Sequence, residues 1–488
     1  MNDHAKESSI EQQAIKGASW LAFYRLISQL FSWVVTIVVA RILSPEDYGL
    51  MAMATILTGY AMLFNELGLG AAIIQRPKTN QEELSSVFWF SFMTSSVLAM
   101  GAFAAAYPTS WIFGEPRLIP ITKTVSVVFI INGLQIVPLS LIKKELNFKR
   151  LGFIEMTGIL VSCVGMLVMA LLGAGVWTLI GGYIIQGVTK LVLLYYHQGW
   201  FPRLYYRFQD AKSYIGFGIM VAVGGSFHYV FEQSDKFFAG RAWSSKILGY
   251  YAFAWQLACM PTDKIVTLIN QVSFSVFSRL QDDRERFNKF YLNINKATAT
   301  LVLPLFAGGF ILGDELIRVV LNEKWWAIST LFRFLCLAQI LVSINAVNNF
   351  VHTAQGRPEW RLYFNGTCAV LMSVSFFFAV QHGLEAILVP WFTTYLLISL
   401  VWITLTLRQI GITVFDYLQN LSVPFCATIA VSAVVLLTGQ VLRSIPLELP
   451  HESIFLLLKI AVGALCYVSF MLLFAREFLI NAIKLLRA

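Results

Sequence analysis

Residues 17–40 read GASWLAFYRLISQLFSWVVTIVVA, a nearly continuous apolar run that is long enough to cross a bilayer. A helix rises 1.5 Å per residue, so about 20 apolar residues span the ~30 Å hydrocarbon core of a membrane. The run is too long for the apolar part of a signal peptide, and no small-residue cleavage site follows it. We therefore expect residues 17–40 to form a retained transmembrane helix.

Similar runs recur along the whole chain. The sequence has 488 residues, of which 57% are hydrophobic and 13% charged, with a mean hydropathy of +0.69. Soluble domains carry about 25% charged residues. The sequence predicts an all-α polytopic membrane protein with about 14 transmembrane helices. The runs fall at 17–40, 48–72, 84–107, 120–141, 151–173, 176–196, 213–239, 247–275, 296–313, 328–350, 362–381, 386–407, 420–442 and 453–475.

The distribution of lysine and arginine predicts the orientation. An even number of spans places both termini on one side. If the N-terminus is cytoplasmic, more than half of the 36 basic residues fall in cytoplasmic segments, as the positive-inside rule requires. We expect both termini in the cytoplasm. The same bias accounts for the net charge of +9, which therefore does not indicate nucleic-acid binding.

A weak internal repeat appears at an offset of 200 residues, where residues 40–49 align without gaps on residues 240–249. Each copy follows the first helix of a six-helix group, so the repeats are parallel, an arrangement known in transporters. The repeat predicts two pseudo-symmetric six-helix bundles. The identical pairs are Arg41/Arg241, Ser44/Ser244, Gly49/Gly249, Ala52/Ala252 and Ala54/Ala254.

The domain boundaries follow from these spans. Residues 1–196 form the N-terminal lobe and residues 213–407 the C-terminal lobe. Between them, residues 197–212 read HQGWFPRLYYRFQDAK, which mixes aromatic and basic residues as expected of an amphipathic segment at the cytoplasmic interface. The segment is either the linker between the lobes or an interfacial anchor with no further role.

Polar residues within spans are the candidate site. An ionisable side chain costs about 2.5–3.5 kcal/mol at a helix centre, so such groups usually face a cavity or a partner. In the first helix, Arg25 is followed at helical spacing by Gln29 and Ser32. These residues are expected to line a substrate cavity. The alternative for Arg25 is that it extends to the cytoplasmic headgroups.

The seventh helix carries His228, Glu232, Asp235 and Lys236, again at helical spacing. The 200-residue offset places Gln29 and Ser32 on Tyr229 and Glu232, so the two polar stripes are expected to meet across a central cleft. Glu232 and Lys236 alternatively form a structural i, i+4 pair, and His228 alone is expected to be a packing residue.

Three further places carry candidates. Glu66 and Glu155 lie near span ends, where they serve coupling or gating or else simply reach the interface. In the eighth helix Pro261 precedes Asp263 and Lys264; a kink there would bring both charges into the cavity. Residues near other span ends are expected to be interfacial, namely Lys190, Arg333 and Lys459.

Enzymatic chemistry finds no support in the sequence. The six cysteines lie in apolar runs without a CxxC motif, which predicts buried free thiols and no disulfide. The six histidines lack metal-ligand spacing, and no P-loop occurs. We expect no catalytic residue, no metal and no cofactor. A membrane-bound glycosyltransferase or polymerase would need a large periplasmic loop, and all loops here are short.

Several ordered segments resemble the polysaccharide transporter (PST) family of the multidrug/oligosaccharidyl-lipid/polysaccharide (MOP) exporter superfamily, within it the Wzx group that includes colanic-acid exporters. The resemblance covers nearly the whole chain. The segments are GASW at 17–20, ARILSPEDYGLMAMA at 40–54, LGLGAAIIQR at 67–76, KKELNFKR at 143–150, FSRLQDDRERF at 277–287 and GDELIRVVLNEKWW at 313–326.

The resemblance implies a flippase that translocates an undecaprenyl-diphosphate-linked oligosaccharide across the bacterial inner membrane by alternating access. It implies two helical bundles and two additional C-terminal helices, here within 408–488. It further implies a cationic cavity for the diphosphate, with Arg25 as the best candidate and Lys236 and Lys264 as supplements. Glu232, Asp235 and Asp263 would then serve ion coupling.

The partners that the resemblance implies are the lipid-linked substrate, membrane lipids and the polysaccharide polymerase or export machinery. The alternatives are a cation-coupled multidrug antiporter or a lipid II flippase of the same superfamily, and, in another class, the membrane-bound glycosyltransferase or polymerase.

Overall fold

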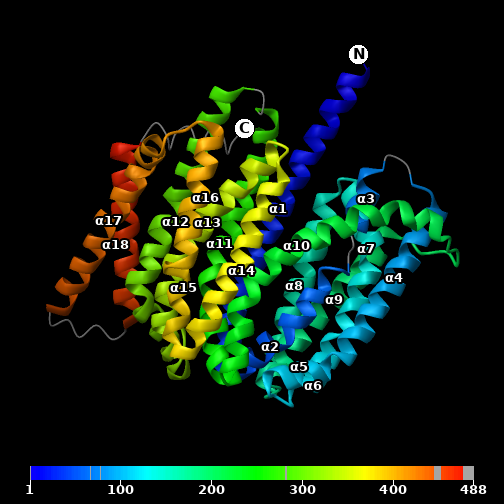
Figure 1. Ribbon diagram of the computed structural model, residues 1–488, viewed down its shortest axis with the longest axis horizontal. Coiled ribbons are helices and arrows are strands. Elements are labelled where there is room, and N and C mark those ends of the chain that lie inside the picture. Colours follow the sequence, from blue (N-terminus) through cyan, green and yellow to red (C-terminus); the bar gives the residue numbers. More distant parts are fainter. Residues whose placement is uncertain (1, 66–67, 77–78, 281–282, 445–451, 476–488) are drawn as a thin grey trace. The chain divides into compact units, whose positions relative to one another are not determined.

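The computed structural model describes residues 2–65, 68–76, 79–280, 283–444 and 452–475 (Figure 1). All regular elements in these ranges are helices, which confirms the predicted all-α class. The chain forms two compact units, Met1–Gly249 and Tyr250–Ala488. The predicted linker at 197–212 lies inside the first unit, and the division into lobes at that segment stays a prediction.

The first unit holds ten helices and the start of an eleventh among the residues described. Their ends carry clear signals: Ser44 caps α2 in a reciprocal capping box with Asp47, and Asn80 caps α4 by accepting from the Glu83 N–H. The helices are α1 (Asn2–Ile42), α2 (Pro45–Met62), α3 (Leu69–Gln75), α4 (Gln81–Ala104), α5 (Ala106–Phe113), α6 (Leu118–Val125), α7 (Val127–Lys144), α8 (Phe148–Leu171), α9 (Val176–Gln198), α10 (Phe208–Ala242) and α11 (Ser245–Arg279).

The second unit continues from α11. Asp283 caps α12 by accepting from the Arg286 N–H, and three 3₁₀ segments interrupt the later helices. The elements are α12 (Arg284–Val320), η1 (Glu323–Ile328), α13 (Ser329–Ala354), α14 (Pro358–Ala379), η2 (Val380–His382), η3 (Glu385–Leu388), α15 (Val389–Phe392), α16 (Thr394–Ile410), α17 (Val414–Ser444) and α18 (Glu452–Phe474).

Eleven helical segments in the described residues are long and apolar enough to cross a membrane. The three predicted spans at 48–72, 213–239 and 247–275, which correspond to α2, α10 and α11, are not among them. The protein is a multi-pass membrane protein, and the count of 14 spans stays a prediction.

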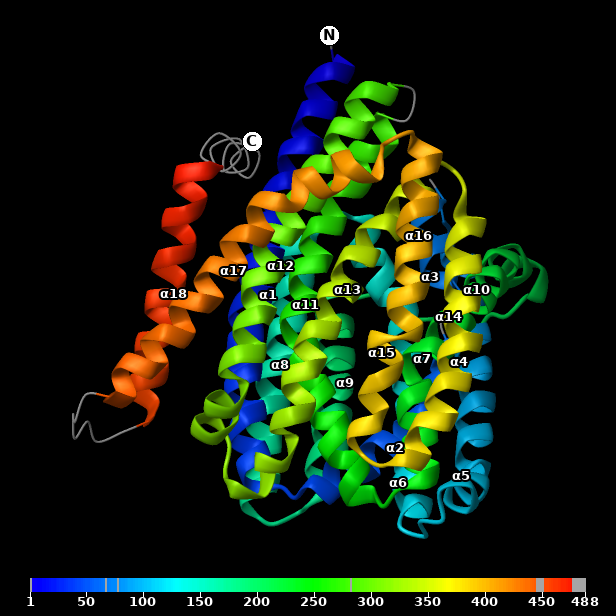
Figure 2. The same cartoon turned by 60° about the vertical axis from the view of Figure 1, so that its left-hand side comes forward.

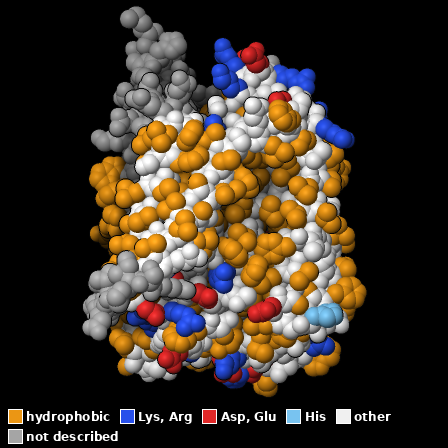
Figure 3. Space-filling view, turned by 90° about the vertical axis from the view of Figure 1, so that its left-hand side faces the viewer, with side chains coloured by type: hydrophobic (Ala, Val, Ile, Leu, Met, Phe, Trp, Pro, Cys, Tyr) orange, Lys and Arg blue, Asp and Glu red, His pale blue; other side chains and the backbone are white. Residues whose placement is uncertain are grey.

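The outward-facing side chains of the helices are apolar. Leu26, Val97 and Val192 each expose about 60% of their surface, and on one face of the molecule hydrophobic side chains form a broad band with charged residues gathered above and below it (Figure 3). A soluble protein rarely exposes so much contiguous apolar surface. The exposed apolar side chains of these helices are therefore suited to contact with lipid.

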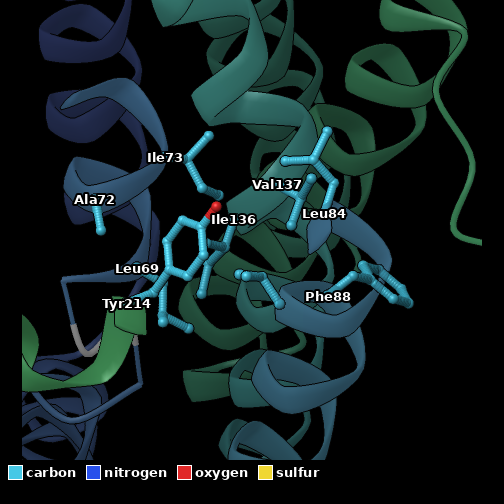
Figure 4. Packing of buried hydrophobic residues seen from close by; sticks show 9 residues of the cluster. Leu69, Ala72, Ile73, Leu84, Phe88, Ile136, Val137 and Tyr214 are labelled. Atoms are coloured by element: carbon cyan, nitrogen blue, oxygen red, sulfur yellow. The ribbon is translucent and has the colours of Figure 1, made fainter. Parts of the chain in front are cut away.

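Within the first unit, α8 packs between α1 and α9, while α4 packs on α7. A buried cluster joins α3, α4, α7 and the start of α10 (Figure 4). Tyr214 of α10 is fully buried in it, next to Leu69 and Ile73 of α3. This cluster fixes the first turns of α10 to one end of the unit.

The two copies of the internal repeat meet where α2 and α11 begin. A Cβ on Gly49 would lie 1.7 Å from the carbonyl oxygen of Ser245, and a Cβ on Gly249 would lie 1.7 Å from that of Pro45. The contact is reciprocal between positions 200 residues apart. Only glycine permits backbones to approach so closely, which explains why both copies have it at this position.

In the second unit α12 is the central helix and contacts α13, α17 and α18. The last two helices, α17 and α18, lie side by side (Figure 2). All six cysteines are free thiols. The prediction that all are buried is wrong for Cys426, which is exposed on α17, because an apolar run places residues toward lipid as well as toward the core.

Candidate functional site

A cavity of about 400 Å³ lies within the first unit. It mixes apolar, hydroxyl, aromatic and amide groups, which is typical of ligand pockets. Most of its lining comes from α2 and the residue that follows it, and the rest comes from the end of α6, from α9 and from α10. The lining residues are Met51, Thr55, Thr58, Gly59, Met62, Leu63, Val125, Tyr183, Tyr229 and Gln233.

Tyr229 fastens α10 to α2 beside this cavity. Its hydroxyl group donates to the backbone carbonyls of Thr55 at 3.1 Å and Ile56 at 2.8 Å. Gly59 makes the approach possible, because a Cβ there would lie 2.2 Å from the Tyr229 hydroxyl oxygen. The Tyr60 ring packs against Tyr229 with centroids 5.9 Å apart. The cavity is therefore bounded by a contact between α2 and α10 that combines ring packing with the hydrogen bonds of the Tyr229 hydroxyl group.

The charged residues predicted on α10 have different hydrogen-bond and ion-pair partners. Glu232 pairs with His228, with 3.2 Å between Oε1 and Nε2, and Lys236 donates to the side-chain oxygen of Gln233 at 3.1 Å. Asp235 is buried, with 1% of its surface exposed. Of this stretch, Gln233 and Tyr229 line the cavity, and sequence reasoning had not selected Gln233.

Arg25 and Glu155, which the sequence suggested separately, form an ion pair between α1 and α8. The Arg25 Nε lies 3.0 Å from Oε2 of Glu155, and Nη2 lies 3.5 Å from Oε1. The side chains are 46% and 24% exposed. The pair places a guanidinium group and its counter-ion together on a membrane-spanning segment. Gln29 and Ser32 are half-buried on the same helix.

The cavity lining comes from α10 but not from α1. The convergence of the two polar stripes, that of α1 and that of α10, on one chamber therefore stays a prediction.

The other predicted residues have mixed outcomes. Glu66 lies outside the described residues, as do the side chains of Asp263 and Lys264. Pro261 is half-buried inside α11, which continues as a helix through it. The hydroxyl of the next residue, Thr262, donates to Gln339 of α13 at 3.0 Å. The proposed hinge at Pro261 is therefore tied to a neighbouring helix by a buried hydrogen bond.

A second intramembrane ion pair lies in the second unit. Lys459 of α18 donates to Glu315 of α12 at 2.5 Å, and its side chain is only 8% exposed. The expectation that Lys459 is interfacial stays a prediction; the structure shows its side chain buried where α18 packs against α12 and α17. Gly439 of α17 makes room for it, since a Cβ there would lie 3.2 Å from the lysine Cε.

A buried polar seam runs along α13. The Asn345 amide donates to Ser399 at 2.7 Å, Tyr291 donates to Asn348 at 2.7 Å, and His352 lies 2.9 Å from the Thr406 hydroxyl. The partners are neutral, so the seam ties α13 to α12 and α16 without charge. Periodicity alone could not reveal it, because asparagine and serine are scattered within an apolar run.

The described residues hold no cluster of His, Cys, Asp and Glu that could bind a metal. What they hold is a cavity of mixed polar and apolar lining and ion pairs inside a lipid-exposed, all-helical frame. These features are those of a multi-pass membrane protein with an internal cavity.

Comparison with known proteins identifies the family. The profile of the family described as polysaccharide biosynthesis protein matches residues 38–330. The chain belongs to this family.

Relatives that match most of the chain are named for the biosynthesis of cell polysaccharides. The chain is 24% identical over 471 residues to the teichuronic acid biosynthesis protein TuaB of Bacillus subtilis (strain 168), covering 94% of this chain and 95% of the relative. It is 24% identical over 361 residues to the lipopolysaccharide biosynthesis protein WzxC of Escherichia coli (strain K12), covering 73% of each. It is 24% identical over 459 residues to the succinoglycan biosynthesis transport protein ExoT of Rhizobium meliloti (strain 1021), covering 92% and 91%.

Solved structures share the fold. The lipid II flippase MurJ in an inward closed conformation superposes with a TM-score of 0.75 over 94% of this chain and 99% of MurJ, at 13% identity. An inward-facing multidrug resistance MATE transporter of the MOP superfamily gives a TM-score of 0.64 over 78% of this chain and 94% of its own, at 15% identity. The family match confirms the predicted relationship to polysaccharide transporters, and the solved structures show the same fold.

Proposed function

We propose that this protein is a flippase that moves an undecaprenyl-diphosphate-linked oligosaccharide repeat unit across the bacterial inner membrane. The observation that carries the proposal is membership in the polysaccharide biosynthesis family over residues 38–330. Relatives named for teichuronic acid, lipopolysaccharide and succinoglycan synthesis support it. All three are named for the biosynthesis of a polysaccharide or a glycolipid, and ExoT is named a transport protein.

The physical task explains the polar interior. A diphosphate and its sugars cannot cross ~30 Å of hydrocarbon without polar partners, since each unsatisfied polar group costs several kcal/mol there. A cavity with hydroxyl, amide and aromatic groups between α2, α9 and α10 suits the sugar portion. The polyprenyl chain is apolar and stays in lipid throughout.

In this proposal Arg25 receives the diphosphate, with Lys236 and Lys264 as supplements. Glu155 then competes with the substrate for the Arg25 guanidinium, at 3.0 Å in the present structure. Such competition keeps binding moderate, so that release on the far side is also favourable. Gln29, Ser32, Glu232, Asp235 and Asp263 complete the cavity, while Glu66, Glu155 and Pro261 serve coupling or gating.

The proposed topology has 14 spans with both termini in the cytoplasm. Residues 1–196 and 213–407 are two pseudo-symmetric six-helix lobes, joined by 197–212, and residues 408–488 add two helices. Alternating access requires the lobes to rock about a fixed site. The α10–α2 contact through Tyr229 is a candidate latch for this motion. Polymerase or export proteins are proposed partners.

Deletion of the gene, followed by mass spectrometry of lipid-linked intermediates, tests the proposal. Accumulation of one defined repeat unit on undecaprenyl diphosphate at the cytoplasmic leaflet is expected. Unchanged lipid-linked pools would contradict the proposal.

Two other transport activities share the fold. A multidrug antiporter is represented by the MATE likeness, and drug efflux from vesicles would reveal it. A lipid II flippase is represented by the MurJ likeness, and accumulation of lipid II in the deletion strain would reveal it. Both likenesses concern the fold, whereas the family match favours a polysaccharide precursor. The protein is not an enzyme, because its family and fold are those of transporters.

A further inference from the structure

The segment between α9 and α10, residues 199–207, forms no helix but is fastened along the start of α4; we call it the strap. Four hydrogen bonds join the backbone of the strap to side chains of α4, and the Trp200 side chain makes a fifth hydrogen bond to α4. Arg203 N–H donates to Ser85 at 3.0 Å, Arg207 N–H to Ser86 at 3.1 Å, Trp89 to the Arg203 carbonyl at 2.8 Å, Gln81 to the Phe201 carbonyl at 2.8 Å, and Trp200 to Gln81 at 2.7 Å.

The inner side of the strap rests on the buried cluster of α3, α4 and α7. Trp200 and Trp89 pack against this cluster from the strap and from α4. Hydrogen bonds and packing together hold the strap in one conformation. A segment fixed in this way presents a defined outer surface.

That outer surface combines large apolar and basic side chains. Leu204 is 94% exposed and Phe201 is 65% exposed. Arg203 and Arg207 are also exposed. The Arg207 guanidinium donates to the neutral amide oxygen of Gln209 at 3.0 Å. Apolar groups of this size are unfavourable in water, and basic groups beside them favour an anionic partner.

Three carboxylates lie near the strap. Glu83 of α4 is 3.9 Å from Arg76 and accepts from the Tyr214 hydroxyl at 3.2 Å, while Glu82 is exposed in the first turn of α4 and Asp210 lies in the first turn of α10. Arg203 and Arg207 are the basic groups that the strap itself exposes.

The position of the strap at the ends of two candidate membrane spans indicates that its partner is the lipid headgroup region. The candidate membrane span Val176–Gln198 ends one residue before it, and the span Gln81–Ala104 begins at the residue whose amide holds it. The strap thus lies at the boundary between hydrocarbon and water. At this level, aromatic and leucine side chains enter the headgroup region and basic side chains bind lipid phosphate.

We propose that the strap is a built membrane-interface site that binds anionic phospholipid headgroups through Arg203 and Arg207 and inserts Leu204 and Phe201 among the lipids. It anchors the first unit in the plane of the membrane. The site is independent of the transported substrate, so its test does not depend on flippase activity.

Lipid selectivity tests the charge. The full-length protein is reconstituted in phosphatidylcholine, and the motionally restricted fraction of spin-labelled phosphatidylglycerol is compared with that of spin-labelled phosphatidylcholine. The double variant Arg203→Gln/Arg207→Gln should lower the preference for phosphatidylglycerol by about fivefold. It keeps the backbone donors, so the strap stays fastened. The charge-matched control, Arg286→Gln/Lys289→Gln in the first turns of α12, should leave the preference unchanged.

Depth tests the apolar contact. A nitroxide on Leu204→Cys, in a protein whose more accessible Cys259, Cys426 and Cys466 are replaced by alanine, should be more accessible to oxygen than to a water-soluble nickel chelate. The exposed Glu285→Cys at the start of α12 serves as the aqueous control. A Leu204 label as water-accessible as the control, or an unchanged lipid preference in the strap variant, would overturn the proposal.

Discussion

At the scale of single residues, Arg25 and Glu155 form an ion pair between α1 and α8 of the first unit. Their side chains are about half and one-quarter exposed, at a separation of 3.0 Å. An arginine in a span needs a counter-charge when no substrate is present. The carboxylate of Glu155 supplies it. In the proposed function the substrate diphosphate, with more charge and more acceptor oxygens, replaces the carboxylate.

We predict that Arg25→Ala abolishes polymer export and leaves membrane insertion intact. The variant also leaves Glu155 without this partner, so the double variant Arg25→Ala/Glu155→Gln is the informative control. It removes both charges and should restore stability without restoring export. Export is measured as cell-surface polymer, and insertion as protein in the membrane fraction. Normal export by the double variant would remove Arg25 from the substrate site.

A second residue-scale prediction concerns Arg117 in the loop before α6. Its guanidinium donates to Glu115 at 2.7 Å and to Glu46 at 2.6 Å. The hydrogen bond from Arg117 lowers the pKa of Glu115 below its usual value of 4.5. A lowered folded-state pKa stabilises the protein above the unfolded pKa, and this contribution is lost as pH falls through the folded value.

Arg117→Gln should therefore lower the Tm at pH 7, and the difference from the wild type should shrink when the pH falls below about 4. Thermal unfolding of the purified protein at both pH values measures this. An equal difference at both pH values would show that the pair acts through packing instead.

At the scale of elements, helix crossings depend on residues without side chains. The α2–α11 crossing places Gly49 and Gly249 where a Cβ would meet a carbonyl oxygen at 1.7 Å. We predict that Gly49→Ala lowers the Tm and reduces export, because the two helix starts must separate. Gly101→Ala on α4 is the matched control, since a Cβ there meets nothing within 4 Å. It should be neutral or stabilising by up to ~1 kcal/mol. Equal effects of the two substitutions would contradict the close crossing.

The attachment of α18 to α12 rests partly on Lys459 and Glu315. Lys459→Met should destabilise the protein by roughly 1–3 kcal/mol, because it removes the lysine that pairs with the partly buried Glu315 carboxylate. The double variant Lys459→Met/Glu315→Gln should recover most of this loss, as replacing both members of a buried pair often does. A double-mutant cycle in thermal unfolding measures the coupling. Additive losses would show that the pair contributes nothing specific.

At the scale of the whole molecule, the number of spans decides where the C-terminus lies. Fourteen spans with a cytoplasmic N-terminus predict a cytoplasmic C-terminus, whereas an odd number would place it outside. Alkaline phosphatase fused after Arg203 or at the C-terminus should be inactive, and fused after Ser444 it should be active. Green fluorescent protein at the same positions should give the opposite pattern. An active phosphatase at the C-terminus would contradict the even count.

Hydropathy alone determined that the chain is helical and embedded in a membrane, because an apolar run of about 20 residues has no other stable form in lipid. The same pattern of apolar runs does not identify the uncharged polar residues that are buried between the helices. It did not select Gln233 and Tyr183 of the cavity or the polar seam of α13, since hydropathy is averaged over a span and does not show which neighbour a polar side chain faces.

The sequence alone also revealed the repeat that contains Gly49 and Gly249. It showed that Arg25, Glu155 and Lys459 are charged residues within apolar spans. Only the tertiary structure decided that the first two charges pair with each other and that Lys459 pairs with Glu315. Ion pairs between helices depend on which faces meet, and those faces are set by packing across more than a hundred residues of chain. Local spacing contains no information about a partner so distant.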